Sequence, residues 1–215
     1  MRLINGRVQM LREALSELGR ALFCKGLVGK MKMGNFYFIN DDYFIDFPDN
    51  KLMANRETRS GTVHDRPCFY AIYEEKTSIY WLIPISSQIE KFKSIYQKKI
   101  QHYGKCDTIV FGKVLGHEKA FLIQNMCPII PRYIKNKYID SKSGLPVKIE
   151  GVLEREIVKK AKKVLALQRK GVKLIFPDVL KIEQELIKLI TVSFRLRITE
   201  YIYPEYSLNF VVSNK

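Results

Sequence analysis

Two pairs of apolar segments constrain the fold of this chain more than any other feature. The two segments of each pair are close together in the sequence. Residues 68–75 (CFYAIYEE) and 77–84 (TSIYWLIP) are rich in β-branched and aromatic side chains, and the polar run EEKTS joins them. Residues 108–115 (TIVFGKVL) and 119–126 (KAFLIQNM) repeat this arrangement around a Gly-His-Glu turn. Each pair indicates a β-hairpin, so we expect antiparallel strands.

Segments with helical periodicity lie between and after the hairpins. Apolar residues recur at helical spacing over residues 89–100 and 151–171, and again after Pro177. Strands grouped in hairpins, with helices between them, predict an α+β fold. We expect a compact, strongly bent antiparallel sheet that is covered by helices.

The two ends of the chain differ from this central pattern. Residues 1–33 carry leucines at helical spacing, followed by glycines, which predicts a helical extension. Residues 191–215 are rich in β-branched and aromatic side chains and are interpreted as a strand-like tail. We therefore predict an N-terminal helical extension (1–33), a central functional domain (34–190) and a C-terminal tail (191–215).

The charge of the chain points to a polyanionic partner. There are 37 Lys and Arg residues against 22 Asp and Glu residues, which gives a formal net charge of +15. Nucleic acid is the leading candidate partner, and a basic but inert surface is the alternative.

Cysteine and histidine spacing predicts no metal or other cofactor, since the four cysteines form no CxxC pair and the three histidines stand apart. Buried free thiols are expected, and they favour a reducing cytoplasm. No apolar run approaches the roughly 18 residues of a membrane span, and no secretory signal is expected.

Ser86 and Ser87 stand where a predicted strand gives way to a predicted helix, and they are candidates for two roles. Ser87 to Glu90 fits the S-x-x-E capping box, in which each side chain bonds a backbone N–H at the helix start. The remaining N–H groups of such a helix end would also form an anion site. Ser86 and Lys91 would then lie beside a bound phosphate, and both interpretations stay open.

Candidate catalytic residues precede the predicted strand at residues 68–75. His64 and Arg66, in the HDRP sequence that ends a predicted long loop (48–67), can transfer a proton and hold a phosphate, respectively. A solvated loop is the alternative. Tyr43 can stack on a base or donate to a phosphate, although packing in the core is favoured. His117, in the Gly-His-Glu turn, is interpreted as structural.

Basic residues on the predicted helices and on the segment 131–139 are candidates for RNA contacts, although a solvated helix face explains most such lysines equally well. They are Lys93, Lys98, Lys99, Arg132, Lys135, Lys159, Lys160 and Lys163.

Five motifs, taken in order, resemble the toxin endoribonucleases of type III toxin–antitoxin systems, the ToxN/AbiQ group, and especially its CptN-like and TenpN-like branches. The motifs are NFYFINDDYFIDF, HDRPCFYAIY, IYWLIPISSQIEKFK, CDTIVFG and AFLIQNMCPI, and the resemblance extends over about Phe36 to Leu189. It implies a compact sheet like the barrel of MazF and Kid toxins, and RNA cleavage without a metal. It also implies inhibition by a small structured RNA made from repeats upstream of the gene, with toxin and RNA in closed hetero-oligomers.

The resemblance also implies roles for particular residues. The family's tyrosine after the first strand matches Tyr43, and its basic residue before the second strand falls near His64 or Arg66. Its hydroxyl pair at a strand end matches Ser86 and Ser87. The family's lysine can follow that pair more closely than Lys91 does here.

RNA cleavage without a metal needs a base for the ribose 2′-OH, donors for the phosphorane and an acid for the leaving 5′-oxygen, and it yields a 2′,3′-cyclic phosphate. We expect His64 to act as base or acid, Arg66, Lys91 and Ser86 to stabilise the phosphorane, and Tyr43 to position the nucleotide. The alternatives are a non-catalytic nucleic-acid-binding protein and a MazF-like type II toxin with a protein antitoxin.

Overall fold

The computed structural model describes residues 31–59 and 61–202. Residues 31–183 form one compact unit, and the described part of a second unit is residues 184–202. The predicted extension 1–33 lies outside the described residues except for its last three positions, and so do residues 203–215 of the predicted tail. The predicted domain limits at residues 33 and 190 therefore stay predictions.

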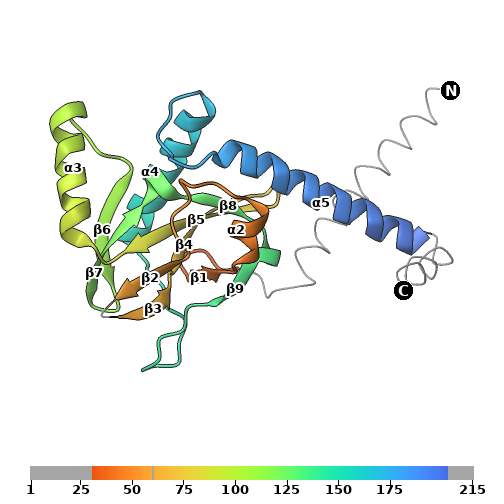
Figure 1. The fold of residues 1–215 in the computed structure, drawn as a ribbon, viewed down its shortest axis with the longest axis horizontal. Coiled ribbons are helices and arrows are strands. Elements are labelled where there is room, and N and C mark those ends of the chain that lie inside the picture. The colour runs from red at the N-terminus through yellow and green to blue at the C-terminus, as the bar shows by residue number, and fades with distance from the viewer. Residues whose placement is uncertain (1–30, 60, 203–215) are drawn as a thin grey trace. The chain divides into compact units, whose positions relative to one another are not determined.

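A seven-stranded antiparallel sheet forms the centre of the compact unit (Figure 1). The strands follow the order β6 (Ile109–Val114), β7 (His117–Leu122), β5 (Ile79–Ser86), β4 (Cys68–Glu74), β1 (Phe36–Ile39) and β9 (Ile134–Lys137), with β8 (Cys127–Ile129) also paired to β5. Both predicted hairpins are confirmed, as β4–β5 and β6–β7. Among the described strands no pairing joins β6 to β9, so the sheet is open and a closed MazF-like barrel is not confirmed.

Helices and one further hairpin complete the described fold. The helices are α2 (Asp42–Asp46), α3 (Ile89–Tyr103), α4 (Val152–Arg169) and α5 (Val179–Ile202), and short 3-10 turns occupy Ile123–Asn125 and Pro131–Tyr133. The predicted long loop 48–67 is wrong in its second half, where β2 (Arg56–Arg59) pairs with β3 (Thr62–Asp65) in a separate two-stranded hairpin. Most of its residues are polar, and β3 is largely exposed, so the sequence lacks the alternation of apolar and polar residues that marks a strand with one buried face.

The strand-like interpretation of residues 191–202 is also wrong, because α5 continues through them. The β-branched and aromatic side chains there suggested a strand. However, no glycine or proline interrupts the chain between Pro177 and Pro204. Without such a breaker, a helix that has already begun extends at low cost, so local β-propensity did not decide the structure.

A strong bend in the sheet encloses an aromatic core. The Phe36 ring of β1 lies 5.4 Å from that of Phe69 and 6.2 Å from that of Phe121 on β7, centroid to centroid. Two strands separate β1 from β7, so a flat sheet would hold them about 14 Å apart. Contact between Phe36 and Phe121 therefore requires the sheet to curl, with these rings on its concave face.

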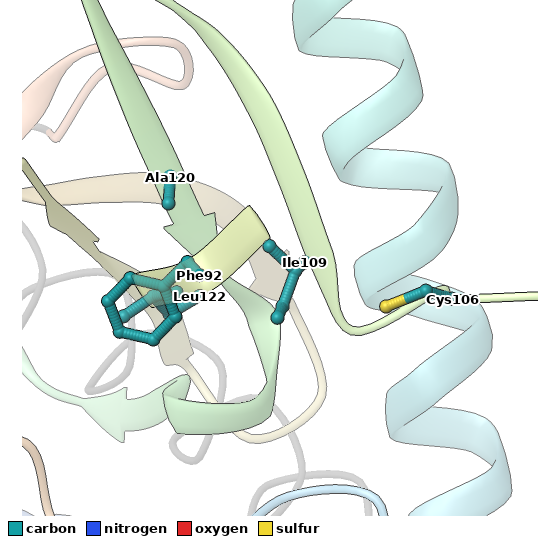
Figure 2. Packing of buried hydrophobic residues seen from close by; sticks show 5 residues of the cluster. All are labelled: Phe92, Cys106, Ile109, Ala120 and Leu122. Atoms are coloured by element: carbon teal, nitrogen blue, oxygen red, sulfur yellow. The ribbon is translucent and has the colours of Figure 1, made fainter. Parts of the chain in front are cut away.

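The helices pack against the sheet with the predicted apolar faces. Phe92 of α3 joins Ile109, Ala120 and Leu122 of the β6–β7 hairpin in one cluster, which also includes Cys106 (Figure 2). In the stripe predicted on residues 151–171, Ile157, Ala161 and Val164 are buried, and α4 contacts β4. The three described cysteines are buried and free, as predicted, and Cys24 lies outside the described residues.

Candidate active site

A cavity lies on the concave face of the sheet, and side chains of the sheet form its floor. In the core of the bend, Phe36 pairs with Phe69 across β1 and β4. Successive side chains alternate between the faces of a strand, so the next row on the concave face contains Phe38, Pro67 and Ile85. These three residues line the cavity, which has a volume of about 520 Å³. The register of the strands thus continues the aromatic core into the cavity floor.

The same alternation brings polar groups from β7 to the cavity. Phe121 lies in the core, and Lys119 and His117 follow on its face at steps of two residues. Ile85 pairs with Phe121, so Ser87 comes to lie opposite Lys119. The Lys119 ammonium donates a hydrogen bond of 2.7 Å to the Ser87 hydroxyl. Lys119 and His117 both line the cavity, and Ser87 is joined to it through this bond.

His64, on β3, lines the cavity from the β2–β3 hairpin. Arg66 fixes the base of this hairpin, since its Nε donates to the Ala54 carbonyl at 2.9 Å and its Nη1 donates to the Ile85 carbonyl at 3.0 Å. The same guanidinium lies 3.1 Å from the Glu57 carboxylate. Arg66 is only 6% exposed, and burial lowers its pKa. These partners occupy the guanidinium, so Arg66 holds His64 in place and does not face a phosphate.

The imidazoles of His64 and His117 meet the same open space from two different hairpins. Both side chains are exposed, and within residues 31–59 and 61–202 neither is hydrogen-bonded. Asp65, their acidic neighbour, is already engaged: a hydrogen bond from Lys135 at 2.5 Å holds the pKa of its carboxyl below the ordinary value, and Arg56 adds to this effect. The cavity therefore offers two proton-transfer groups and one ammonium to a ligand.

The predicted capping box at Ser87 is wrong. Helix α3 begins at Ile89, its N-cap is Gln88, and no side chain caps it. The Ser87 hydroxyl faces Lys119 instead, because a bond to a charged ammonium is stronger than one to a backbone N–H. Ser86 is buried, and its hydroxyl accepts the Gln88 N–H at 3.2 Å.

Lys91 is exposed on α3 and does not line the cavity. Its ammonium lies 5.7 Å from the centre of the adjacent Phe92 ring. His64 thus lines the cavity without Lys91, and the pair Lys119 and Ser87 lies where the sequence predicts Lys91 and Ser86.

Tyr43 lies in the core. Its hydroxyl donates to the Pro128 carbonyl at 2.8 Å, and its ring lies 5.2 Å from that of Phe47 and 5.6 Å from that of Tyr133. Burial raises the pKa of Tyr43 well above its ordinary value. Tyr43 is therefore packed in the core, which is the interpretation that the sequence favours over a catalytic role. It does not line the cavity.

Replacing Tyr43 with phenylalanine should lower stability without lowering activity. The change removes a buried hydrogen bond, so the free energy of unfolding should fall by about 1 to 2 kcal/mol. Urea denaturation measures this, and Tyr96→Phe, at a half-buried ring that packs edge-on against Phe111, is the matched control. A selective loss of RNA cleavage by Tyr43→Phe, with stability intact, would restore the catalytic role.

The basic candidates for RNA contacts are spread over several elements. Ion pairs engage many of them: Lys93 with Glu118 and Glu90, Lys135 with Asp65, Lys160 with Glu156, Lys163 with Asp107, and Arg132, at 3.9 Å, with Asp46. Lys98 and Lys159 are exposed. Among these ion pairs, that of Lys135 with Asp65 is the one that involves a residue lining the cavity.

Lys99 differs from the other basic candidates because it is half-buried. Its ammonium donates to the Thr108 hydroxyl at 2.8 Å and to the Gln124 side-chain oxygen at 2.7 Å, and burial lowers its pKa. These bonds anchor α3 to the strands beneath it, so Lys99 is less available to a phosphate than a solvated lysine.

The sequence contained a signal for the residues that were missed. The β7 sequence HEKAFL alternates, and a strand places His117, Lys119 and Phe121 on one face. Applied to this segment, that alternation would have set His117 and Lys119 on the face of a core phenylalanine. The predicted turn includes His117 and so favours a structural role for it, whereas the residue is the first of β7.

The fold belongs to the α+β class, with an open, bent antiparallel sheet and helices against it, and comparison with solved structures identifies a protein that shares it. AbiQ, described as a lactococcal anti-phage endoribonuclease belonging to the type-III toxin–antitoxin system, matches with a TM-score of 0.51 and 15% sequence identity. The match covers 74% of this chain and 99% of AbiQ. The resemblance drawn from the sequence motifs is thereby confirmed at the level of the fold.

No protein-family model and no curated protein sequence matches the chain. Over the described residues, no group of three or more His, Cys, Asp and Glu side chains is arranged to hold a metal ion. In the same part of the chain, no helix is both long and apolar enough to cross a membrane.

Proposed function

We propose that this chain is an endoribonuclease toxin of a type III toxin–antitoxin system. The observation that carries the proposal is the meeting of two exposed imidazoles, from His64 and His117, with the Lys119–Ser87 pair at one cavity. The fold shared with AbiQ, an endoribonuclease of such a system, and the net charge of +15 support it.

The proposed reaction is an attack of the ribose 2′-OH on the adjacent phosphorus. One imidazole of the pair His64 and His117 accepts the 2′-OH proton as the O2′–P bond forms. The other imidazole, protonated at the start, donates its proton to the 5′-oxygen as the P–O5′ bond breaks. The products are a 2′,3′-cyclic phosphate and a 5′-hydroxyl end, and the two imidazoles have exchanged protonation states.

The phosphorane would be stabilised by Lys119 and Ser87. The negative charge that develops on the non-bridging oxygens is greatest in the transition state, so a fixed donor aimed there lowers the barrier. The Lys119 ammonium supplies the charge. Because the Ser87 hydroxyl accepts from Lys119, its own hydrogen is directed elsewhere and can donate to a phosphate oxygen. Arg66 contributes by holding the β2–β3 hairpin that carries His64.

The proposed partners are cellular RNA substrates and a small structured repeat RNA that acts as the antitoxin in the cytoplasm. Exposed lysines such as Lys98 and Lys159 would contact the phosphates of that RNA, and a closed hetero-oligomer of toxin and RNA would block the cavity. A non-catalytic RNA-binding protein would explain the charge equally well, but it does not require two imidazoles beside an ammonium.

Expression of the chain with and without the region upstream of its gene tests the proposal. Growth arrest without that region, and growth with it, is the expected result. If the protective part of the region proves to be an open reading frame, a type II system with a protein antitoxin is correct instead. If cells grow normally without the region although the folded protein accumulates, the toxin proposal is contradicted.

A further inference from the structure

The cavity is lined by two chemically different sets of residues. His64, His117 and Lys119 are the groups that the proposed reaction uses. Aromatic and aliphatic side chains line the same cavity, among them Phe38, Tyr138, Val63 and Leu115. A volume of about 520 Å³ is in the range of sites that enclose a small organic ligand, and the phosphate chemistry leaves these apolar side chains unused.

Two of the rings that line the cavity, Phe38 and Tyr138, form a corner. Phe38 and Tyr138 are both half-buried, their centroids are 5.3 Å apart, and their planes are inclined at 66°. The Tyr138 N–H donates to the Phe36 carbonyl at 2.9 Å, which ties the tyrosine backbone to β1. A third flat ring that enters this corner can stack on one ring and meet the edge of the other, the two arrangements that aromatic pairs prefer.

Two apolar side chains stand at the rim, one on each hairpin. Val63 of β3 is 60% exposed, and Leu115, in the β6–β7 turn, is 47% exposed. Leu115 has a φ of 50°, in the left-handed region that residues other than glycine seldom adopt. Large apolar side chains exposed together around a concave site mark a surface that contacts a ligand.

We infer that the apolar side chains of the cavity, with the Phe38–Tyr138 ring pair at their centre, form a binding subsite for one unpaired nucleobase of the RNA, next to the scissile phosphate. This inference rests on the proposed function. Tyr138 and Phe38 provide the stacking surface, and Val63 and Leu115 close over the edges of the base. Every nucleobase has a flat π-face, so stacking of this kind tolerates all four bases and contributes about 10- to 100-fold per base. A base within a duplex cannot enter, so the substrate is single-stranded.

Single abasic ribonucleotides test the subsite. Short single-stranded RNAs with the base deleted on the 5′ or the 3′ side of the cleavage site are compared with the intact RNA. We expect kcat/KM of the wild-type protein to fall about 10- to 100-fold for one of the two abasic RNAs. Tyr138→Leu should lower kcat/KM on intact RNA by a similar factor and should not lower it further on that abasic RNA. Tyr103→Leu, at an exposed ring at the end of α3, is the matched control and should change neither value.

Three outcomes contradict parts of this account separately. Wild-type cleavage that ignores both abasic positions overturns the subsite and leaves the nuclease intact. An equal loss on intact and abasic RNA in Tyr138→Leu also overturns it, because the tyrosine then acts independently of the base. Failure of the wild type to cut any RNA contradicts the proposed function itself. If Tyr138→Leu does not fold, Val63→Ser at the exposed rim provides the same comparison.

Discussion

Replacing His64 or His117 with glutamine is expected to lower kcat for RNA cleavage about 10³-fold, because each change removes one of two proton-transfer groups. Glutamine keeps hydrogen-bonding capacity and approximate size but cannot carry the proton. RNA binding, measured with a substrate whose scissile 2′-OH is replaced by hydrogen, should persist within a few-fold. His102→Gln is the matched control, since this third histidine is exposed on α3 and packs edge-on against Tyr103, 4.4 Å away.

The same variants should separate the two roles by their pH dependence. A base must start neutral and an acid must start protonated, so the wild-type rate should pass through a maximum and fall on both sides. The residual activity of each glutamine variant should lose one flank of this curve, and the two variants should lose opposite flanks. Loss of the same flank in both, or full activity in either, would contradict the assignment of an acid–base pair.

Replacing Lys119 with methionine is expected to lower kcat about 10²- to 10³-fold, with a smaller effect on RNA binding. Methionine preserves most of the side-chain length and removes the charge that faces the developing phosphorane. Ser87→Ala should cost less, because the ammonium stays while its hydroxyl partner is lost. Single-turnover cleavage isolates this chemical step from binding and product release.

Lys91→Met distinguishes the structural assignment from the one drawn from the sequence. Lys91 does not line the cavity, so its replacement should leave single-turnover cleavage within about two-fold of the wild type. If Lys91→Met is inactive and Lys119→Met is active, the cavity at β7 is not the catalytic centre. Circular dichroism and thermal unfolding of both variants show whether either loss reflects misfolding.

The elements of the fold were largely predictable, because each depends on a short stretch of chain. Alternating apolar segments joined by polar turns indicated both hairpins, and the residues that recur at helical spacing are the buried faces of α3 and α4. The second half of the predicted loop and the end of α5 were missed. In both places the local composition indicates the wrong structure: the β2–β3 strands consist mostly of polar residues, and α5 is rich in β-branched residues at its end.

The membership of the candidate site was harder to predict, because it depends on the pairing of distant strands. Ser87 and Lys119 are 32 residues apart, and only the register of β5 with β7 places them opposite each other. Arg66 was recognised as a residue of the right chemistry, but the sequence could not show that backbone carbonyls and Glu57 occupy its guanidinium. His64 alone among the predicted catalytic residues lines the cavity.

Analysis of the RNA ends tests the central claim most directly. The purified protein is incubated with a single-stranded RNA, in the presence of a chelator, and with the same RNA carrying one 2′-deoxynucleotide at the cleavage site. We expect 2′,3′-cyclic phosphate and 5′-hydroxyl ends from the first RNA, and no cleavage at the modified position of the second. Products with 5′-phosphate ends, or equal cleavage of the 2′-deoxy substrate, would contradict attack by the ribose 2′-OH at this site.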